Sequence, residues 1–313
     1  MEKVFKTLRS IFLSAPGRGA VSSLLLFSSF FAMFSSLPTI SAYISESRAK
    51  GLFAALFGAV FSFAFGGIWG VVLYSVVVVL GSVIIGELIK SGKDFKTVIT
   101  ISSISIMGVY LLSFLVYAFI NSSGLMELLI SMVNTAFDLI TKNYPQFIEQ
   151  QLMNTGMSRS ELIRETAIQI PSVVSVTIMV FVLVNVIMLA RSKWNISKFL
   201  RIENLKKVKL PEKIVWLAIA VGAFYLYSVS EYNTSMGMKA IGLFLFRTLA
   251  VVYFLQGIII VHQFSISMLG GGLISIMLFS LLVVFAYMFV VAVGFFDLWF
   301  NFRKYIKKEG DRT

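Results

Sequence analysis

The sequence predicts an all-α fold, a polytopic bundle of about eight transmembrane helices. Of its 313 residues, 58% are hydrophobic and only 13% are charged, against roughly 45–50% and 25% in ordinary soluble domains. A water-soluble domain needs a polar surface and cannot hide so many apolar side chains, whereas a bilayer accepts them. Helices are expected because each one satisfies its own backbone hydrogen bonds within hydrocarbon.

The apolar residues fall into successive runs, most of them near the roughly 20 residues that a helix needs to cross a bilayer. Gly66 and Gly67 are expected to divide one long run into two spans, and Gly270–Gly272 to begin the last span. Pro38 and Pro171 are expected in the last or first turns of spans, where proline is tolerated. The predicted spans are 19–44, 51–67, 69–89, 97–120, 170–190, 214–230, 240–262 and 273–298.

Hydrophilic segments flank and interrupt the predicted transmembrane domain, residues 19–298. A basic amphipathic leader, residues 1–18, precedes it, and a basic tail, residues 299–313, follows it. Residues 121–168 combine charges with periodic apolar positions, which predicts amphipathic surface helices between the fourth and fifth spans. Residues 191–213 form a strongly basic loop. The net charge of +12 lies mainly in such segments, where Lys and Arg meet anionic headgroups, so no nucleic acid partner is expected.

The orientation in the membrane stays open, because Lys and Arg divide evenly between the two sides of an eight-span bundle. We favour a cytoplasmic loop 191–213 and an external segment 121–168. Placing both the loop and the tail in the cytoplasm requires that one apolar run does not cross as a plain helix. The run 264–298, with its three consecutive glycines, is the expected place for a broken or re-entrant helix. The inner membrane of a bacterial cell is the expected location.

No pattern for catalysis or metal binding is recognisable. The chain has no cysteine and a single histidine, His262, which excludes thiolate sites and leaves too few ligands for a standard transition-metal site. We find no phosphate-binding Walker loop, no dinucleotide-binding glycine pattern after a strand, and no convincing nucleophile elbow. The sequence therefore predicts a protein that is not an enzyme and that has no cofactor and no metal.

Small residues recur every fourth position along the second predicted span, at Ala54, Gly58, Ser62, Gly66 and Gly70. Such a ridge lets another helix approach closely, and close packing drives helix association in lipid. We interpret the ridge as a packing surface, with a ligand pocket as the alternative.

Hydroxyl groups mark two of the predicted spans. The first span repeats serine at Ser22, Ser29 and Ser36, with Ser28 and Ser35 beside them. The fourth span carries its hydroxyls near one face, at Thr100, Ser103, Tyr110, Ser113 and Tyr117. These groups either bond to carbonyls of their own helix or line a solute cavity. The fourth span is the better candidate wall, because its tyrosines offer both stacking and hydrogen bonding.

Arg247 lies inside the seventh predicted span, where an arginine is costly unless it is paired or hydrated. It either extends to the nearer interface, pairs with a carboxylate such as Asp297 or Glu87, or binds an anionic ligand. Tyr253 and Gln256 lie on another face of the same span.

The C-terminal string from Gly294 to Lys304 places Asp297, Asn301 and Lys304 on one helical face. The carboxylate of Asp297 needs a cation, and Arg303 or Arg247 could supply it.

The chain resembles the YybS-like family of bacterial membrane proteins, whose role is unknown. The resemblance spans nearly the whole length and is clearest at 255–260 (Leu-Gln-Gly-Ile-Ile-Ile) and at the ending Gly294, Asp297 and Arg303, although Asn301 stands where the family is expected to have an acid. This family is in turn similar, more distantly, to the substrate-binding membrane subunits of energy-coupling-factor vitamin transporters.

These observations predict a small-solute-binding or transport-associated membrane component, which would couple to partner subunits through its basic loop. The alternative is a non-transporting scaffold or assembly partner. The candidate ligand-binding residues are Ser103, Tyr110, Tyr117, Arg247, Tyr253 and Gln256. The candidate structural residues are Gly58, Gly257, Gly294, Asp297 and Arg303.

Overall fold

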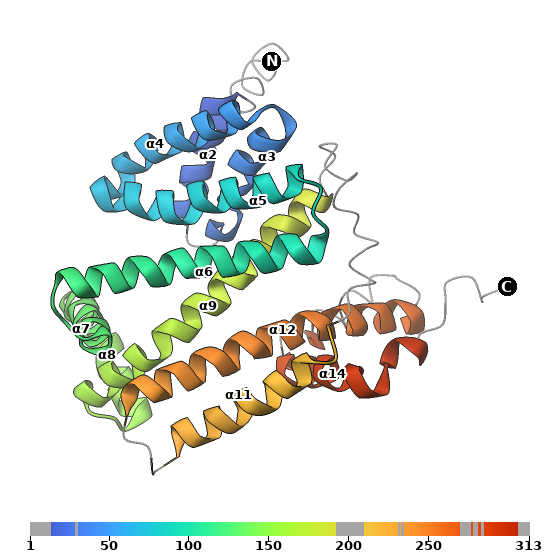
Figure 1. Ribbon diagram of the computed structural model, residues 1–313. Coiled ribbons are helices and arrows are strands. Elements are labelled where there is room, and N and C mark those ends of the chain that lie inside the picture. The colour runs from blue at the N-terminus through green and yellow to red at the C-terminus, as the bar shows by residue number, and fades with distance from the viewer. Residues whose placement is uncertain are drawn as a thin grey trace. The chain divides into compact units, whose positions relative to one another are not determined.

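The computed structural model describes residues 14–28, 31–191, 210–230, 232, 235–269, 277, 281–282 and 285–305. Within these residues the chain is helical and contains no strand (Figure 1), so the predicted all-α class is confirmed. The chain divides into two compact units. The first comprises Met1–Phe114 and Thr177–Lys207, and the second comprises Leu115–Val176 and Val208–Thr313.

Four helices of the described chain are long and apolar enough to cross a membrane. They are Arg48–Lys90, Phe95–Ile120, Arg159–Ala190 and Met236–Ser265. Two shorter helices, α11 (Ile214–Val229) and α14 (Tyr287–Phe300), are also apolar. The expected number of about eight spans is not confirmed. Most of the leader and of the basic loop, and much of the predicted last span with its three glycines, lie outside the described residues.

Large apolar side chains are exposed along these helices, as lipid contact requires. Val60 is 73% exposed, Trp69 74%, Phe119 86% and Trp216 74%. A soluble protein rarely exposes so much apolar surface, so these faces fit a hydrocarbon environment rather than water.

The prediction that residues 19–44 form a single helix is wrong. The chain forms α2 (Ala15–Phe27), a short 3₁₀ turn η1 (Ala32–Phe34) and α3 (Leu37–Ser45). Pro38 opens α3 instead of closing a long helix. A proline has no N–H for the carbonyl four residues earlier, so a helix that reaches it from upstream loses a hydrogen bond there.

The second and third predicted spans form a helical hairpin. Its elements are α4 (Arg48–Tyr74), the π-helical turn η2 (Ser75–Val79) and α5 (Leu80–Lys90). The helix breaks at Gly67, with φ 56° and ψ −145°, and a Cβ atom at Gly70 would lie 2.5 Å from the carbonyl oxygen of Ser62. The chain therefore folds back on itself at the glycine pair, as predicted, and Figure 1 shows the two arms.

The small-residue ridge of α4 is a packing surface within the chain, as we interpreted it. A Cβ atom at Gly19 of α2 would lie 2.1 Å from the carbonyl oxygen of Ala54. A Cβ atom at Gly58 would lie 2.0 Å from the hydroxyl oxygen of Tyr74 and 2.7 Å from the carbonyl oxygen of Gly19. Helix α2 and the returning arm therefore cover the ridge from Ala54 to Gly58.

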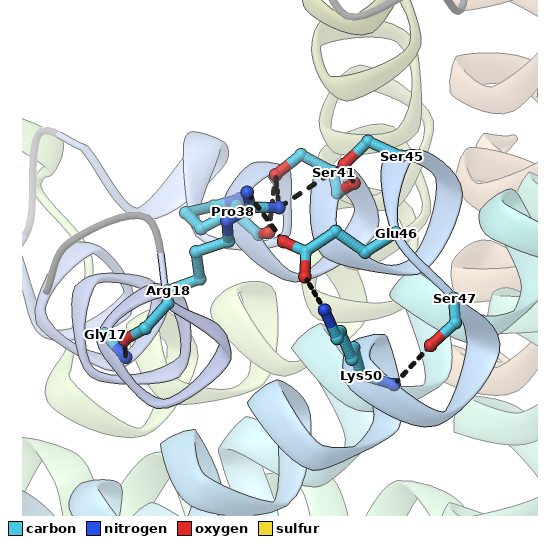
Figure 2. Close-up of polar contacts among 9 residues, drawn as sticks. Gly17, Arg18, Pro38, Ser41, Ser45, Glu46, Ser47 and Lys50 are labelled. Carbon is cyan, nitrogen blue, oxygen red and sulfur yellow. Dashed lines mark hydrogen bonds and ion pairs between the residues drawn. The ribbon is translucent and has the colours of Figure 1, made fainter. Parts of the chain in front are cut away.

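Ion pairs tie together the ends of α2, α3 and α4 (Figure 2). Arg18 Nη2 lies 2.9 Å from Glu46 Oε1, and Lys50 Nζ lies 3.0 Å from Glu46 Oε2. Arg18 also donates to the hydroxyls of Ser41 and Ser45, both at 3.5 Å. Arg18, the last residue of the predicted leader, lies in α2.

A second charged group lies at the C-terminal end of α5. The Tyr43 ring fits a slot in which a Cβ atom at Gly51 or Gly86 would overlap it, and its hydroxyl donates to Glu87. Glu87 also pairs with Arg48, whose Nε lies 2.6 Å from Glu87 Oε1.

In the second unit, α7 (Leu125–Asn143) and α8 (Pro145–Thr155) occupy the predicted amphipathic segment. The next helix, α9, runs from Arg159 to Arg191, so Pro171 lies inside it and not in its first turn as predicted.

Helix α12 (Met236–Leu269) packs against both α11 and α14. At its closest point to α14, a Cβ atom at Gly257 would lie 1.9 Å from the carbonyl oxygen of Val290. A Cβ atom at Gly294 would lie equally close to the carbonyl oxygen of Tyr253. Both glycines therefore allow backbone contact between the two helices.

Candidate functional site

The break between α2 and α3 is surrounded by buried hydroxyl groups, which we call the hydroxyl cluster. Each of its members is at most 2% exposed. They are Ser22, Ser23, Ser35, Ser36, Thr39, Ser62 and Ser82. All of them lie in the first unit, and all of them are uncharged.

Several cluster hydroxyls bond to the interrupted backbone or to each other. Ser22 Oγ donates to the carbonyl oxygen of Ser35. Thr39 Oγ1 donates to the carbonyl oxygen of Ser36 at 2.9 Å and lies 2.5 Å from Ser82 Oγ. Irregular backbone in a membrane needs such partners, because lipid offers none. The sequence supplies them on α2, α3 and α5, next to the segment that needs them.

Helix α9 contributes an amide to the same break. Asn185 is fully buried, and its Nδ2 donates to the carbonyl oxygens of Met33 and Phe181, both at 2.8 Å. Since both neighbours are acceptors, the amide orientation is fixed and Oδ1 is left as an acceptor. The bond to Met33 therefore joins α9 to the backbone of the break.

Three polar atoms at the break have no hydrogen-bond partner among the described residues: Ser35 Oγ, Ser36 Oγ and Asn185 Oδ1. Leaving a buried polar group unpaired costs about 1–3 kcal/mol, and native proteins contain few such groups. The hydroxyls can donate and accept, and the amide oxygen can accept. Chemically, the site can hydrogen-bond an uncharged polar group, and it carries no charge to pair with an ion.

The fourth-span face that we expected to line a cavity is not one buried surface. Ser103 is buried, Tyr110 is half-buried and Tyr117 is 48% exposed. Ser113 is exposed and donates to the carbonyl oxygen of Val109 in its own helix at 2.8 Å. Ser103 Oγ has no hydrogen-bond partner among the described residues. The serine repeat of the first span contributes Ser22, Ser35 and Ser36 to the hydroxyl cluster.

Arg247 does not pair with either carboxylate that we considered. Its Nη1 donates to Ser172 Oγ of α9 at 2.9 Å. Glu87 instead pairs with Arg48, and Asp297 accepts from a different residue of α12, Gln256. The sequence does not indicate this partner, because Ser172 lies far from Arg247 along the chain and is one serine among many.

Tyr253 and Gln256 join the neighbouring elements of the second unit. Gln256 Nε2 donates to Asp297 Oδ2 at 3.0 Å, and its Oε1 accepts from the Leu210 N–H at 3.1 Å. The Tyr253 hydroxyl donates to the carbonyl oxygen of Ile214 at 3.3 Å. These contacts give both residues a structural role in the packing of α11, α12 and α14.

Asp297 is fully buried in α14. The prediction that Asp297, Asn301 and Lys304 share one helical face is wrong. The helix ends at Phe300, because Asn301 adopts a left-handed conformation with φ 47°. Asn301 and Lys304 therefore do not continue the α14 face of Asp297. The side chain of Arg303 lies outside what the structure describes.

No three His, Cys, Asp or Glu side chains gather into a group that could hold a metal ion within the described residues.

Comparison with known proteins places the chain in a family. The family model described as "Predicted membrane protein (DUF2232)" matches residues 20–298, and the chain belongs to this family. No curated protein and no solved structure matches it. The chain is therefore a membrane protein with several apolar helices.

Proposed function

We propose that this member of a membrane-protein family is a small-solute-binding or transport-associated component of a bacterial cell membrane, and that it is not an enzyme. The observation that carries the proposal is the interrupted helix α2–α3. Its break holds three buried polar atoms, Ser35 Oγ, Ser36 Oγ and Asn185 Oδ1, that have no partner among the described residues.

Interrupted helices have a known use in membrane transport. Secondary transporters bind solutes where two half-helices meet, because the unwound backbone and its polar neighbours can contact a ligand there. Irregular backbone is tolerated at membrane depth only where protein or water surrounds it. The hydroxyl cluster is buried within the protein and so meets this condition. Its unpaired atoms form no bond to the described part of the interrupted backbone, so they are free to bond to a ligand.

The solute class follows from the chemistry of the break. The cluster offers hydroxyl donors and acceptors and one amide acceptor, with no charge. An apolar core that includes Ile40, Ile85 and Phe181 lies in the same unit. We propose a neutral compound with a polar head, such as an amide, a ring carbonyl or a hydroxyl, and an apolar or aromatic body.

The resemblance to the YybS-like family, and more distantly to the substrate-binding subunits of energy-coupling-factor vitamin transporters, supports the same proposal. It adds vitamins as the first compounds to test and partner subunits that would contact the basic loop 191–213. The scaffold alternative receives less support, because helix α2 covers the Ala54–Gly58 part of the ridge that motivated it.

The test is a thermal-shift screen of the purified protein in mild detergent against uncharged water-soluble vitamins and nucleosides. A ligand present at 100 times its Kd stabilises the folded state by about 2.7 kcal/mol. The informative variants are Ser35→Ala and Ser36→Ala, because each removes a buried hydroxyl that bonds to nothing in the described chain.

We expect these two variants to be at least as stable as the wild type without ligand, since they remove an unpaired buried polar group. We also expect them to lose most of the ligand-induced stabilisation. Ser113→Ala is the matched control, because that hydroxyl bonds only within its own helix. The proposal fails if no compound stabilises the wild type, or if the shift is the same in all variants.

A further inference from the structure

Arg247 and Ser172 form a second polar contact, separate from the hydroxyl cluster, within apolar stretches of two helices; Ser172 is buried and Arg247 is half-buried. On α9, the nearest preceding charge is Glu165, which lies about 10 Å along the axis from Ser172 at 1.5 Å per residue. On α12, the nearest preceding charge is Lys239, about 12 Å from Arg247 by the same rise. The two helices therefore place the contact at the same depth below their last charged residues.

The guanidinium stays at this depth. Arg247 Nη1 donates to Ser172 Oγ at 2.9 Å, so the side chain does not extend toward the level of Lys239. The Ser172 hydroxyl itself donates to the carbonyl oxygen of Gln169 at 2.8 Å, which leaves its lone pairs for the guanidinium. Extension of Arg247 to the nearer interface, the first alternative from the sequence, stays a prediction, whereas its bond to Ser172 is observed.

The neighbouring hydroxyls of Ser175 and Thr248 already donate their hydrogens to other groups of the chain. Ser175 Oγ donates to the carbonyl oxygen of Ser172 at 2.9 Å, so Thr248, at 2.9 Å from Ser175 Oγ, is the donor of that second bond. These bonds fix α9 against α12 around the arginine. The donors left for a ligand are those of Arg247.

The charge of Arg247 has no counterpart in the described chain. No carboxylate among the described residues forms an ion pair with it. A guanidinium has five N–H donors in a planar fork, and an arginine inside a bilayer costs several kcal/mol unless it is paired or hydrated. The Ser172 hydroxyl accepts a hydrogen bond from one of these donors and does not neutralise the positive charge.

We propose that Arg247, held by Ser172, binds an anionic oxyacid group, a phosphate or a carboxylate. Two oxygens of such a group match two N–H donors of the guanidinium, and these bidentate charge-assisted bonds are the strong ones. The group belongs either to an anionic lipid headgroup or to a free anion. This site is independent of the proposed solute site, which lies in the other unit.

The experiment uses delipidated full-length protein in neutral detergent. The probes are short-chain phosphatidylglycerol, the matching phosphatidylcholine, and sodium phosphate at constant ionic strength, each titrated by thermal shift. The variants are Arg247→Gln, which removes the charge, and Arg247→Lys, which keeps the charge and removes the fork. Lys239→Gln is the matched control, because it removes one positive charge from the same helix.

We expect phosphatidylglycerol to bind the wild type and Lys239→Gln equally, with at least a tenfold loss in Arg247→Gln and a smaller loss in Arg247→Lys. Phosphatidylcholine, which has no net charge, should bind weakly to all four proteins. Competition by sodium phosphate would assign the site to a free anion, and its absence would assign it to a lipid.

The proposal is overturned if neither phosphatidylglycerol nor phosphate binds the wild type, or if Arg247→Gln binds both as the wild type does. If Arg247→Gln does not fold, Arg247→Lys decides the question, because wild-type affinity in that variant would exclude recognition by the guanidinium fork.

Discussion

Replacing Gly257 or Gly294 with alanine tests the closest helix contact in the second unit. The new Cβ atom at Gly257 would lie 1.9 Å from the carbonyl oxygen of Val290, and the one at Gly294 would lie 1.9 Å from the carbonyl oxygen of Tyr253. Both obstacles are backbone atoms, so no change of rotamer relieves the overlap. The helices must separate by about 1.5 Å to restore ordinary contact distances, and even a 0.5–1 Å gap forfeits a quarter to a half of the dispersion attraction.

We expect each substitution to lower the free energy of unfolding by about 3 kcal/mol, the upper part of the range for overpacked sites. The separation would also stretch the 3.0 Å bond between Gln256 and Asp297. The assay is unfolding of the purified protein in mild detergent, followed by tryptophan fluorescence.

Gly222→Ala is the matched control, because a Cβ atom there would meet nothing within 4 Å and it lies in the neighbouring helix α11. It should leave stability unchanged or raise it by about 0.5–1 kcal/mol, the usual gain from alanine over glycine in a helix. If Gly257→Ala proves as stable as Gly222→Ala, α12 and α14 do not pack as described.

Three further substitutions probe the first unit by the same unfolding assay. Gly67→Ala should cost about 1–3 kcal/mol, because φ 56° and ψ −145° suit glycine alone; a neutral result would contradict the hairpin break. Asn185→Leu should cost about 1–3 kcal/mol, because it leaves the buried Met33 carbonyl without its 2.8 Å donor; wild-type stability would show that α9 does not support the break. Glu87→Gln should change the free energy of unfolding little, since its partner Arg48 is largely exposed; a large loss that is the same at low and at high salt would mean that the pair is buried.

The sequence predicted the features that depend on local chemistry. The glycine pair at Gly67 breaks its run, because a residue without Cβ reaches a backbone conformation that others avoid. The ridge around Gly58 is a packing surface, because small residues at spacing four leave one side of a helix smooth. The class of the fold followed from composition, since only lipid accepts so many apolar side chains.

Features that depend on distant partners could not be predicted in this way. The run 19–44 is apolar enough to suggest one helix, and the bond from Asn185 that supports its break comes from α9. Arg247 finds Ser172, a hydroxyl that hydropathy does not distinguish from other serines. The ligand-binding role proposed for Ser103, Tyr110 and Tyr117 stays a prediction.

Water access to the α2–α3 break tests the central claim most directly. The chain has no cysteine, so Ser36→Cys would carry a single thiol at the break. The two controls are Lys93→Cys at an exposed turn and Val60→Cys at an apolar residue that is 73% exposed.

A solute site must admit polar compounds from water. We therefore predict that a small water-soluble methanethiosulfonate reagent modifies Lys93→Cys quickly and Ser36→Cys more slowly, and leaves Val60→Cys in membranes unmodified. A Ser36→Cys thiol as unreactive as Val60→Cys would contradict the account, because the break would then be a dry packing feature.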